Sequence, residues 1–311
     1  MSEMHINNVI TLIDDGNTIP FIARYRKEMH GSCDDQKLRD IFDRLTYIRN
    51  LEKRKEEVTN SIEEQGKMTE ELAEAISKAI TLAEVEDIYR PYKQKRKTRA
   101  SVAKEKGLEP LAELLFGFTL KGVDLNEIAK EYVDQEKGVE TVEDALQGAS
   151  DIIAEIISDS AEARKLLKEF IDKTGVIRSV AKKEEDSVYS MYYDYSEAVK
   201  KIPSHRILAI NRGENEEFLK VSVEVNEDEA IKILNNLFIT EGSSSTDFCK
   251  ESVKDSYSRL IFPSLERETR SNLTDVANEQ AIKMFGSNLK PLLMQPPIKN
   301  KTVLAVDPAY R

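Results

Sequence analysis

A run of basic residues is the part of this sequence whose chemistry can be stated most directly. Between residues 90 and 106 the chain carries eight cations and a single acid, Glu105. Lysine and arginine neutralise phosphates, and the rings of Tyr89 and Tyr92 at the edge of the run can stack on unpaired bases. We predict that RNA or DNA binds through its phosphate backbone to six of these cations, called the basic strip below: Arg90, Lys93, Lys95, Arg96, Lys97 and Arg99. A protein-docking surface and a solvated loop between helices are the alternatives.

The chain as a whole is acidic, so the basic strip differs from its surroundings. There are 46 Lys and Arg residues against 57 Asp and Glu residues, and the formal net charge is −11. An evenly acidic surface repels nucleic acid, so any contact must come from a local basic patch. No stretch approaches the ~18 consecutive apolar residues of a membrane-spanning helix. Residues 1–8 have no secretory-signal pattern, and we expect a cytoplasmic protein that contacts no membrane.

A second group of cations follows the apolar pair Phe21 and Ile22. Its members are Arg24, Arg26 and Lys27. A second phosphate contact is one interpretation. We favour a structural one, in which Phe21, Ile22 and Tyr25 anchor an N-terminal helix while the cations pair with acidic neighbours.

Four tyrosines lie close together further along the chain: Tyr189, Tyr192, Tyr193 and Tyr195. Their rings could stack on bases. More often such residues fill a hydrophobic joint between elements and form hydrogen bonds through their hydroxyl groups. We therefore predict a structural role for this cluster.

The cysteines and histidines do not have the spacing of a catalytic or metal site. Cys33 and Cys249 belong to no C-x-x-C pair, and we expect two reduced, inert thiols. The histidines His5, His30 and His205 are far apart in the sequence. For His205 a capping or hydrogen-bonding role is favoured over catalysis, because a nucleophile and its base need a positioned partnership that adjacency does not give.

A single acid, Asp307, resembles a catalytic carboxylate. Metal-dependent nucleases of the ribonuclease H type bring several carboxylates together around divalent ions. One carboxylate cannot assemble such a site. We predict no enzyme activity, no metal and no cofactor.

Helical periodicity dominates the chain. Apolar residues three and four positions apart predict helices over 36–64 and 141–159. Suitable first residues or caps of helices are Asp34, Thr69, Thr81, Ser160, Asn226, Ser245 and Ser264. Pro291, Pro296 and Pro297 are expected to end the last of these helices. Three short helical segments joined by brief turns within 51–107 indicate a helix-turn-helix-like unit.

Strand character is confined to short segments. In 186–225, the β-branched and aromatic runs His205–Asn211 and Glu217–Val225 flank Arg212–Asn215, which predicts a β-hairpin. Thr302–Val306 is a short apolar run typical of a buried strand. The predicted fold is therefore mainly α: a multi-helix N-terminal region with a helix-turn-helix-like unit and one small β-hairpin.

Several short motifs follow one another in a fixed order. They are Ile19–Glu28 (IPFIARYRKE), Glu86–Lys93 (EDIYRPYK), Lys95–Thr98 (KRKT), Gly107–Ala112 (GLEPLA), Asp194–Glu197 (DYSE), Ile202–Arg206 (IPSHR) and Arg212–Glu216 (RGENE). Each alone is weak, but in order and spacing they resemble the Tex family of bacterial transcription accessory proteins. The resemblance covers residues 10 to 311 approximately.

The resemblance implies a role in transcription and further domains beyond this region: a ribonuclease H-like domain, helix-hairpin-helix elements and an RNA-binding module. It also implies that the chain is truncated at the first strand of the ribonuclease H-like domain. The expected organisation is a helical N-terminal region at 1–185 with the helix-turn-helix-like unit at 51–107, a hairpin with helices at 186–300, and the first strand of the truncated domain at 301–311. We predict a nucleic-acid-binding scaffold of a transcription accessory factor; a protein-interaction scaffold that docks RNA polymerase or the missing domains is the alternative.

Overall fold

The computed structural model describes residues 1–93, 97–183, 185–296 and 299–306. The prediction of a mainly helical chain is confirmed, and the β structure is a small three-stranded antiparallel sheet. By its contacts the chain divides into two compact units: unit 1 is Met1–Lys106 with Asp159–Glu162, and unit 2 is the remainder from Gly107. The expected divisions at residues 185 and 300 stay predictions. Among the described residues, no helix is both long and apolar enough to cross a membrane.

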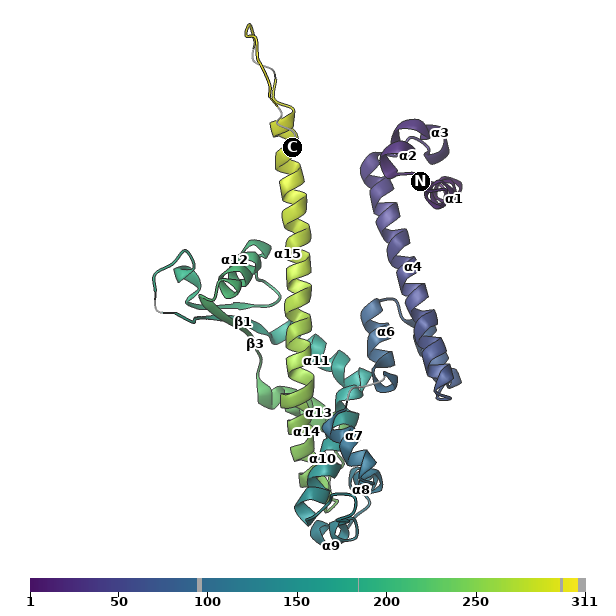
Figure 1. Ribbon diagram of the computed structural model, residues 1–311, viewed down its shortest axis with the longest axis vertical. Coiled ribbons are helices and arrows are strands. Elements are labelled where there is room, and N and C mark those ends of the chain that lie inside the picture. The colour runs from purple at the N-terminus through teal and green to yellow at the C-terminus, as the bar shows by residue number, and fades with distance from the viewer. Residues whose placement is uncertain (94–96, 184, 297–298, 307–311) are drawn as a thin grey trace. The chain divides into compact units, whose positions relative to one another are not determined.

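The first part of unit 1 is a group of short helices on a long one. Its elements are α1 (Glu3–Asp14), α2 (Ile19–Tyr25), α3 (Lys27–His30) and α4 (Asp35–Glu64). The first three lie at the N-terminal end of α4 (Figure 1). A small apolar cluster of Val9, Leu12, Ile19, Ile22 and Leu38 holds them there. Asp34 begins α4 as expected, because its carboxylate accepts a hydrogen bond from the Lys37 amide at 2.8 Å.

The C-terminal half of α4 carries a second cluster. Its other elements are α5 (Glu70–Lys78), α6 (Leu82–Tyr89) and the 3₁₀ turn η1 (Arg90–Tyr92), and α7 (Arg99–Glu105) follows them in the chain. Thr69 and Thr81 cap α5 and α6 as predicted. Helices α4, α5 and α6 contact one another around Leu51, Val58, Ile62, Ile76, Ala79 and Val85. The three-helix arrangement within 51–107 is present, and its assignment as a helix-turn-helix-like unit stays a prediction.

Most of unit 2 is helical. Its helices before the last are α8 (Glu109–Phe116), α9 (Leu125–Lys130), α10 (Val142–Asp159), α11 (Ala161–Thr174), α12 (Ser204–Asn215), α13 (Glu227–Phe238) and α14 (Thr246–Asp255). Small residues let α10 approach the chain at α14 closely: the hydroxyls of Ser150 and Ser252 are 2.8 Å apart, and Ser256 donates to the Ala154 carbonyl at 2.7 Å. The predicted helix over 141–159 is confirmed as α10.

The sheet corrects the predicted hairpin. Its strands are β1 (Val176–Ala181), β2 (Asp194–Ala198) and β3 (Leu219–Glu224), in the order β2-β1-β3 with both pairings antiparallel. The strand expected over Glu217–Val225 is confirmed as β3. The strand expected over His205–Asn211 is wrong, because these residues belong to α12. Ile207 and Ile210 are both buried, and their spacing of three positions fits one face of a helix as well as an irregular strand.

The longest helix, α15 (Phe262–Leu293), runs beside α12 and the sheet within unit 2 (Figure 1). It begins two residues before the expected Ser264 and continues through Pro291, which lies in its last turn. The helix therefore ends at Leu293, between Pro291 and Pro296. The expected strand over Thr302–Val306 does not form: these residues have no partner strand in the described chain, and their apolar side chains are exposed. Pro297 and Asp307 lie outside the described residues.

Candidate nucleic-acid interface

The basic strip follows directly from α6. Arg90 belongs to η1 and is half-buried, whereas Lys93, Lys97 and Arg99 are exposed. Thr98 and Ser101 form a capping box that starts α7, so Arg99 takes the first helical position. The predicted site residues Lys95 and Arg96 lie outside the described residues. Four of the six predicted site residues can therefore be placed, and they come from one short connection between α6 and α7.

The two tyrosines of this segment face the core instead of solvent. The Tyr89 hydroxyl lies 2.9 Å from the Ser61 hydroxyl, and the Arg54 guanidinium lies 5.5 Å from the centre of the Tyr89 ring. The carbonyl of Tyr92 accepts a hydrogen bond from the Gln65 side chain at 2.9 Å. Both rings pack against the cluster between α4, α5 and α6. Tyr89 and Tyr92 therefore hold the basic strip against α4, which is a positioning role that the sequence did not reveal.

Acidic side chains lie next to the exposed cations of the basic strip. Lys93 Nζ is 3.9 Å from Glu86 Oε2, and Lys97 Nζ is 3.7 Å from Glu105 Oε2. Glu86 also accepts a hydrogen bond from Arg54 at 2.6 Å, and this bond raises the pKa of the Arg54 guanidinium. Exposed ion pairs of this length contribute at most about 1 kcal/mol. A phosphate can therefore displace the carboxylates from Lys93 and Lys97 at little cost.

The group of cations that follows Phe21 and Ile22 differs from what the sequence suggested. We call residues 24–27, at the end of α2 and the start of α3, the N-terminal corner. Ile22 is buried and Phe21 half-buried, as expected, but Tyr25 is 61% exposed and its ring contacts the Phe21 ring rather than the core. Within the described residues neither Arg24 nor Lys27 forms an ion pair, so the expected pairing with acids is wrong. The buried residues of α2 are Ile19 and Ile22.

The structural interpretation of the tyrosine cluster is confirmed. Tyr189 packs on Phe218, and Tyr192 meets Tyr195 edge to face with ring centres 5.3 Å apart. The Tyr195 hydroxyl donates to Glu197 and accepts from Arg206 at 3.0 Å. These rings join β2, its preceding turn and the start of α12, and leave no open stacking platform.

The histidines and cysteines have ordinary packing roles. His30 is buried, and its Nδ1 accepts a hydrogen bond from the Cys33 amide at 3.0 Å. His205 lines a cleft between α12 and α15 and forms no hydrogen bond within the described chain, so the expected capping role is wrong. Cys249 is fully buried, and burial raises the pKa of its thiol to about 12. Across the described ranges, no three His, Cys, Asp or Glu residues gather as they would around a metal ion.

Comparison with known proteins gives the family. A model described as "Tex central region-like" matches residues 121–285, and one described as "Tex-like protein N-terminal domain" matches residues 1–63. The chain belongs to the Tex family. The resemblance recognised in the short motifs is thereby confirmed.

Relatives within the family extend well beyond this region. The chain is 50% identical to protein YdcI of Bacillus subtilis over all of its own length and 44% of that protein. It is 37% identical to "Transcriptional accessory protein Tex" of Neisseria gonorrhoeae (99% of this chain, 41% of the relative). It is 33% identical to human "S1 RNA-binding domain-containing protein 1" (98% and 32%). The chain thus spans less than half the length of these relatives.

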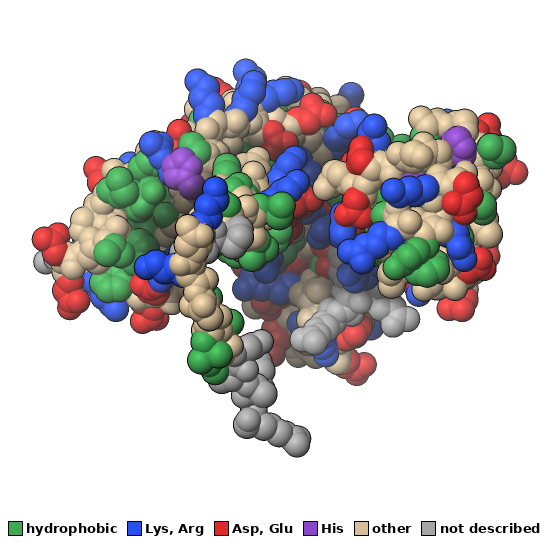
Figure 2. All heavy atoms as spheres, turned by 90° about the horizontal axis from the view of Figure 1, so that it is seen from above, with side chains coloured by type: hydrophobic (Ala, Val, Ile, Leu, Met, Phe, Trp, Pro, Cys, Tyr) green, Lys and Arg blue, Asp and Glu red, His purple; other side chains and the backbone are tan. Residues whose placement is uncertain are grey.

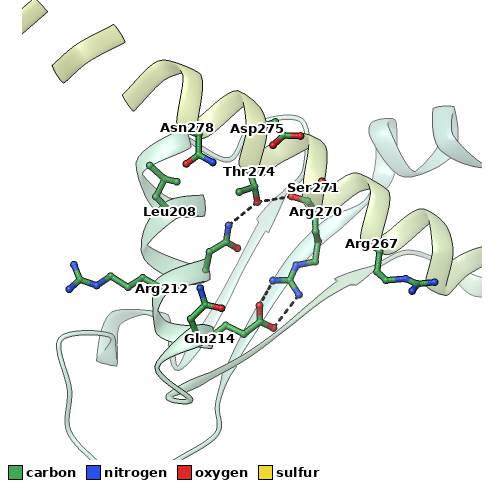
Figure 3. A pocket seen from close by; sticks show the side chains of 11 residues that line it. Leu208, Arg212, Glu214, Arg267, Arg270, Ser271, Thr274, Asp275 and Asn278 are labelled. Atoms are coloured by element: carbon green, nitrogen blue, oxygen red, sulfur yellow. Dashed lines mark hydrogen bonds and ion pairs between the residues drawn. The ribbon is translucent and has the colours of Figure 1, made fainter. Parts of the chain in front are cut away.

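One motif that suggested the Tex family builds a polar cleft of about 640 Å³ between α12 and α15 (Figure 3). Arg270 donates to both carboxylate oxygens of Glu214, and Asn211 donates to Thr274 at 2.8 Å. A Cβ at Gly213 would come within 2.6 Å of the end of the Leu219 side chain, so a larger residue there would displace that side chain. Arg212–Glu216 therefore fastens α12 to α15 and β3, a structural role.

Charges of both signs are mixed on one face of the molecule. On the face shown in Figure 2, Lys and Arg side chains are interspersed with Asp and Glu side chains. A nucleic acid that approaches this face would meet local cations rather than one broad positive field. Phosphate contacts are therefore expected at small sites such as the basic strip and the N-terminal corner.

Proposed function

We propose that this region is a nucleic-acid-binding scaffold of a transcription accessory factor, and that the basic strip contacts phosphates without reading base sequence. One family member carries the name "Transcriptional accessory protein Tex", and another is named for an S1 RNA-binding domain. These names support a role in transcription and an association with RNA. They do not identify the contact, for which the support comes from the basic strip itself.

The exposure of the strip's cations is the observation that carries the proposal. The side chains of Lys93 and Lys97 are 60% and 71% exposed, and their carboxylate partners are themselves exposed at 40% and 67%. Arg99 is exposed beside them. Cations on long side chains, held only by weak pairs, can reorient toward a phosphate. Phosphate contacts position a protein on nucleic acid and carry little base information.

A salt titration of a charge-removal variant tests the proposal. Lys95→Ala, Arg96→Ala and Lys97→Ala are combined, and binding to RNA and DNA, each single- and double-stranded, is measured from low to physiological salt. On duplex DNA each lost phosphate contact should lower the magnitude of the salt slope by about 0.9. We expect weaker binding and a shallower slope, with helicity and melting nearly unchanged.

A matched control removes three exposed lysines elsewhere: Lys200→Ala, Lys201→Ala and Lys220→Ala. This variant changes the net charge equally but leaves the basic strip intact. It should bind with the slope of the wild type. Equal affinity and slope in wild type and strip variant would overturn the proposal.

We further propose that this region acts without catalysis. No clustered carboxylates were found in the sequence, and Asp307 stands alone. Incubation with RNA and DNA in Mg²⁺ or Mn²⁺ should give no cleavage. Metal-dependent cleavage that survives purification and is lost on Asp307→Asn would contradict this.

A protein-interaction scaffold is the second candidate, and one feature of α15 favours it. Four apolar residues recur with steps of three, four and three: Ile282, Phe285, Leu289 and Leu292. Ile282, Phe285 and Leu292 are exposed, which is the pattern of a helix face that packs on a helical partner. Its occupant would be the domains that follow in the longer relatives. RNA polymerase that co-purifies from nuclease-treated extract, with no binding of nucleic acid by the purified chain, would favour protein docking over the basic strip.

A further inference from the structure

We infer that the N-terminal corner is a second contact, which stacks an unpaired base on Tyr25 and neutralises the adjoining phosphates with Arg24 and Lys27. The class of ligand is single-stranded nucleic acid. The inference rests on the proposed function, since both require that the chain binds nucleic acid. It assigns a separate site with a separate chemistry.

An aromatic ring is exposed at the N-terminal corner. Tyr25 is 61% exposed, although the tyrosines Tyr89 and Tyr92 at the basic strip pack into the core. The ring of Tyr25 lies 5.3 Å from that of Phe21, and the Arg26 guanidinium lies 5.3 Å from the centre of the Phe21 ring. An aromatic face beside arginine is the arrangement on which bases of any sequence stack.

The N-terminal corner also carries positive charge. Arg24 and Lys27, which precede and follow Tyr25 in the sequence, are both exposed, and within the described residues neither has a carboxylate partner. Arg26 donates a hydrogen bond to the Tyr25 carbonyl at 3.2 Å, and its guanidinium contacts the Phe21 ring. Arg26 is therefore also close to Tyr25. At the basic strip, by contrast, Lys93 and Lys97 each lie beside an acid. The cations of the corner are therefore available to phosphate without displacing an ion pair.

Contacts among α1, α2 and α3 hold the N-terminal corner in place. Ile22 is fully buried, and the Asn8 side chain donates to the Met29 carbonyl at 3.1 Å, which ties α1 to α3. Gly31 ends α3 with a φ of +62°, and a Cβ there would come within 2.6 Å of the His5 ring. A site built on packed helices loses little conformational entropy on binding.

The corner and the basic strip are separated along α4. The corner packs on α4 near Leu38, and Tyr92 is hydrogen-bonded to Gln65 just beyond the end of that helix. At about 1.5 Å per residue these points are roughly 40 Å apart. A short oligonucleotide can fill one site only, whereas a long one can reach both and gain from the increased effective concentration.

A single tryptophan makes the corner observable. The chain contains no tryptophan, so Tyr25→Trp gives a unique fluorophore at the proposed stacking site. We expect oligo-uridine to quench its emission in a salt-sensitive way, and a blunt RNA duplex of equal length to quench much less. The control is Met191→Trp at an exposed position in unit 2, whose emission should not respond.

Affinity measurements separate the two sites. Tyr25→Ala should weaken oligo-uridine binding about fivefold or more and leave duplex binding unchanged, while Tyr25→Phe should retain the single-strand affinity. Loss of binding in the strip variant with an unquenched Tyr25→Trp emission would overturn the corner and keep the proposed strip. Quenching at Tyr25→Trp together with an unaffected strip variant would keep the corner and overturn the strip.

Discussion

The basic strip and the N-terminal corner have similar residue types but expose different side chains. Both place tyrosine among arginines and lysines near the end of a short helix that packs on α4. At the strip, Tyr89 and Tyr92 are drawn into the core and the exposed lysines lie beside acids. At the corner, Tyr25 is exposed and its neighbouring cations have no acid partner in the described chain. Composition alone therefore does not say which of two basic segments presents an aromatic ring to a ligand.

The difference follows from what covers each tyrosine. Val85, Tyr89 and Tyr92 are four and three positions apart, Val85 is fully buried, and both tyrosine rings pack against the cluster between α4, α5 and α6. In α2 the buried residues are Ile19 and Ile22, and Tyr25, three positions after Ile22, is exposed with its ring against that of Phe21. Similar spacing therefore does not give similar burial.

The largest expected contrast is in stability. Tyr89→Ala removes a ring from the α4–α6 core and the hydrogen bond to Ser61, and should cost about 2–4 kcal/mol of the stability of that cluster. Tyr25→Ala should cost less than about 0.5 kcal/mol, because its ring is mostly exposed. Hydrogen exchange of the α5 and α6 amides measures the first effect without assuming that the two units unfold together. Equal destabilisation by both changes would break the comparison.

The next effect concerns the two thiols. Cys33 is half-buried and packs at the edge of the cluster beneath the corner, whereas Cys249 is sealed in unit 2, where burial raises its pKa to about 12. The thiolate is the reactive form, so an alkylating agent should label Cys33 at least about tenfold faster than Cys249 in the native protein. Mass spectrometry of timed samples measures both rates. Similar rates in denaturant provide the control, and faster native labelling of Cys249 would contradict the described packing.

A smaller effect should distinguish the cations of the two sites. Glu105→Gln removes the acid next to Lys97 and should raise nucleic-acid affinity about two- to threefold at low salt, with the gain vanishing at high salt. Glu28→Gln at the corner removes an equal charge but no ion pair, so its effect should be smaller. Fluorescence anisotropy with one labelled oligonucleotide compares the variants directly. A larger gain from Glu28→Gln would show that the corner cations are screened as strongly as those of the strip.

Much of the helical fold could be predicted because its signals are local. Asp34, Thr69 and Thr81 have short polar side chains that satisfy free amides at helix starts, and each lies where the sequence predicted it. The apolar residues spaced three and four positions apart over 141–159 predicted α10, because this signal is also local in the sequence. The sheet was harder, since β1 pairs with β3 across some forty residues and no local pattern encodes that register. The apolar residues of His205–Asn211 allow either a helix or a strand. The segment packs against β3 and α15 as part of a helix, and this packing is not visible in the local sequence.

The candidate sites were predicted in part. The cations of the strip are legible as residue types, and their acid partners Glu86 and Glu105 are near in sequence. The inward direction of Tyr89 depends on Ser61 and Arg54, which are about thirty residues away on another helix. The outward direction of Tyr25 could not be read from spacing, since Tyr25 lies three positions after the buried Ile22.

The smallest expected effect is a pH dependence of the corner's support. Arg49 donates to both carboxylate oxygens of Asp14, at 2.6 and 2.9 Å, and so ties the end of α1 to α4. This hydrogen bonding holds the pKa of Asp14 below its ordinary value of 3.8. A lowered folded-state pKa means that the pair stabilises fully above the unfolded value and is lost as the pH falls through the folded one. Both side chains are about half exposed, so the contribution is small and salt weakens it. Hydrogen exchange of the α1 amides is measured in the wild type and in Asp14→Asn from mildly acidic pH down to about pH 2. The α1 amides of the wild type should be more protected at mildly acidic pH. The protection of the two proteins, plotted against pH, should converge below about pH 4. Curves that stay parallel would mean that Asp14 does not support the corner through its charge, and the packing of Val9, Leu12 and Ile22 would then be its main attachment.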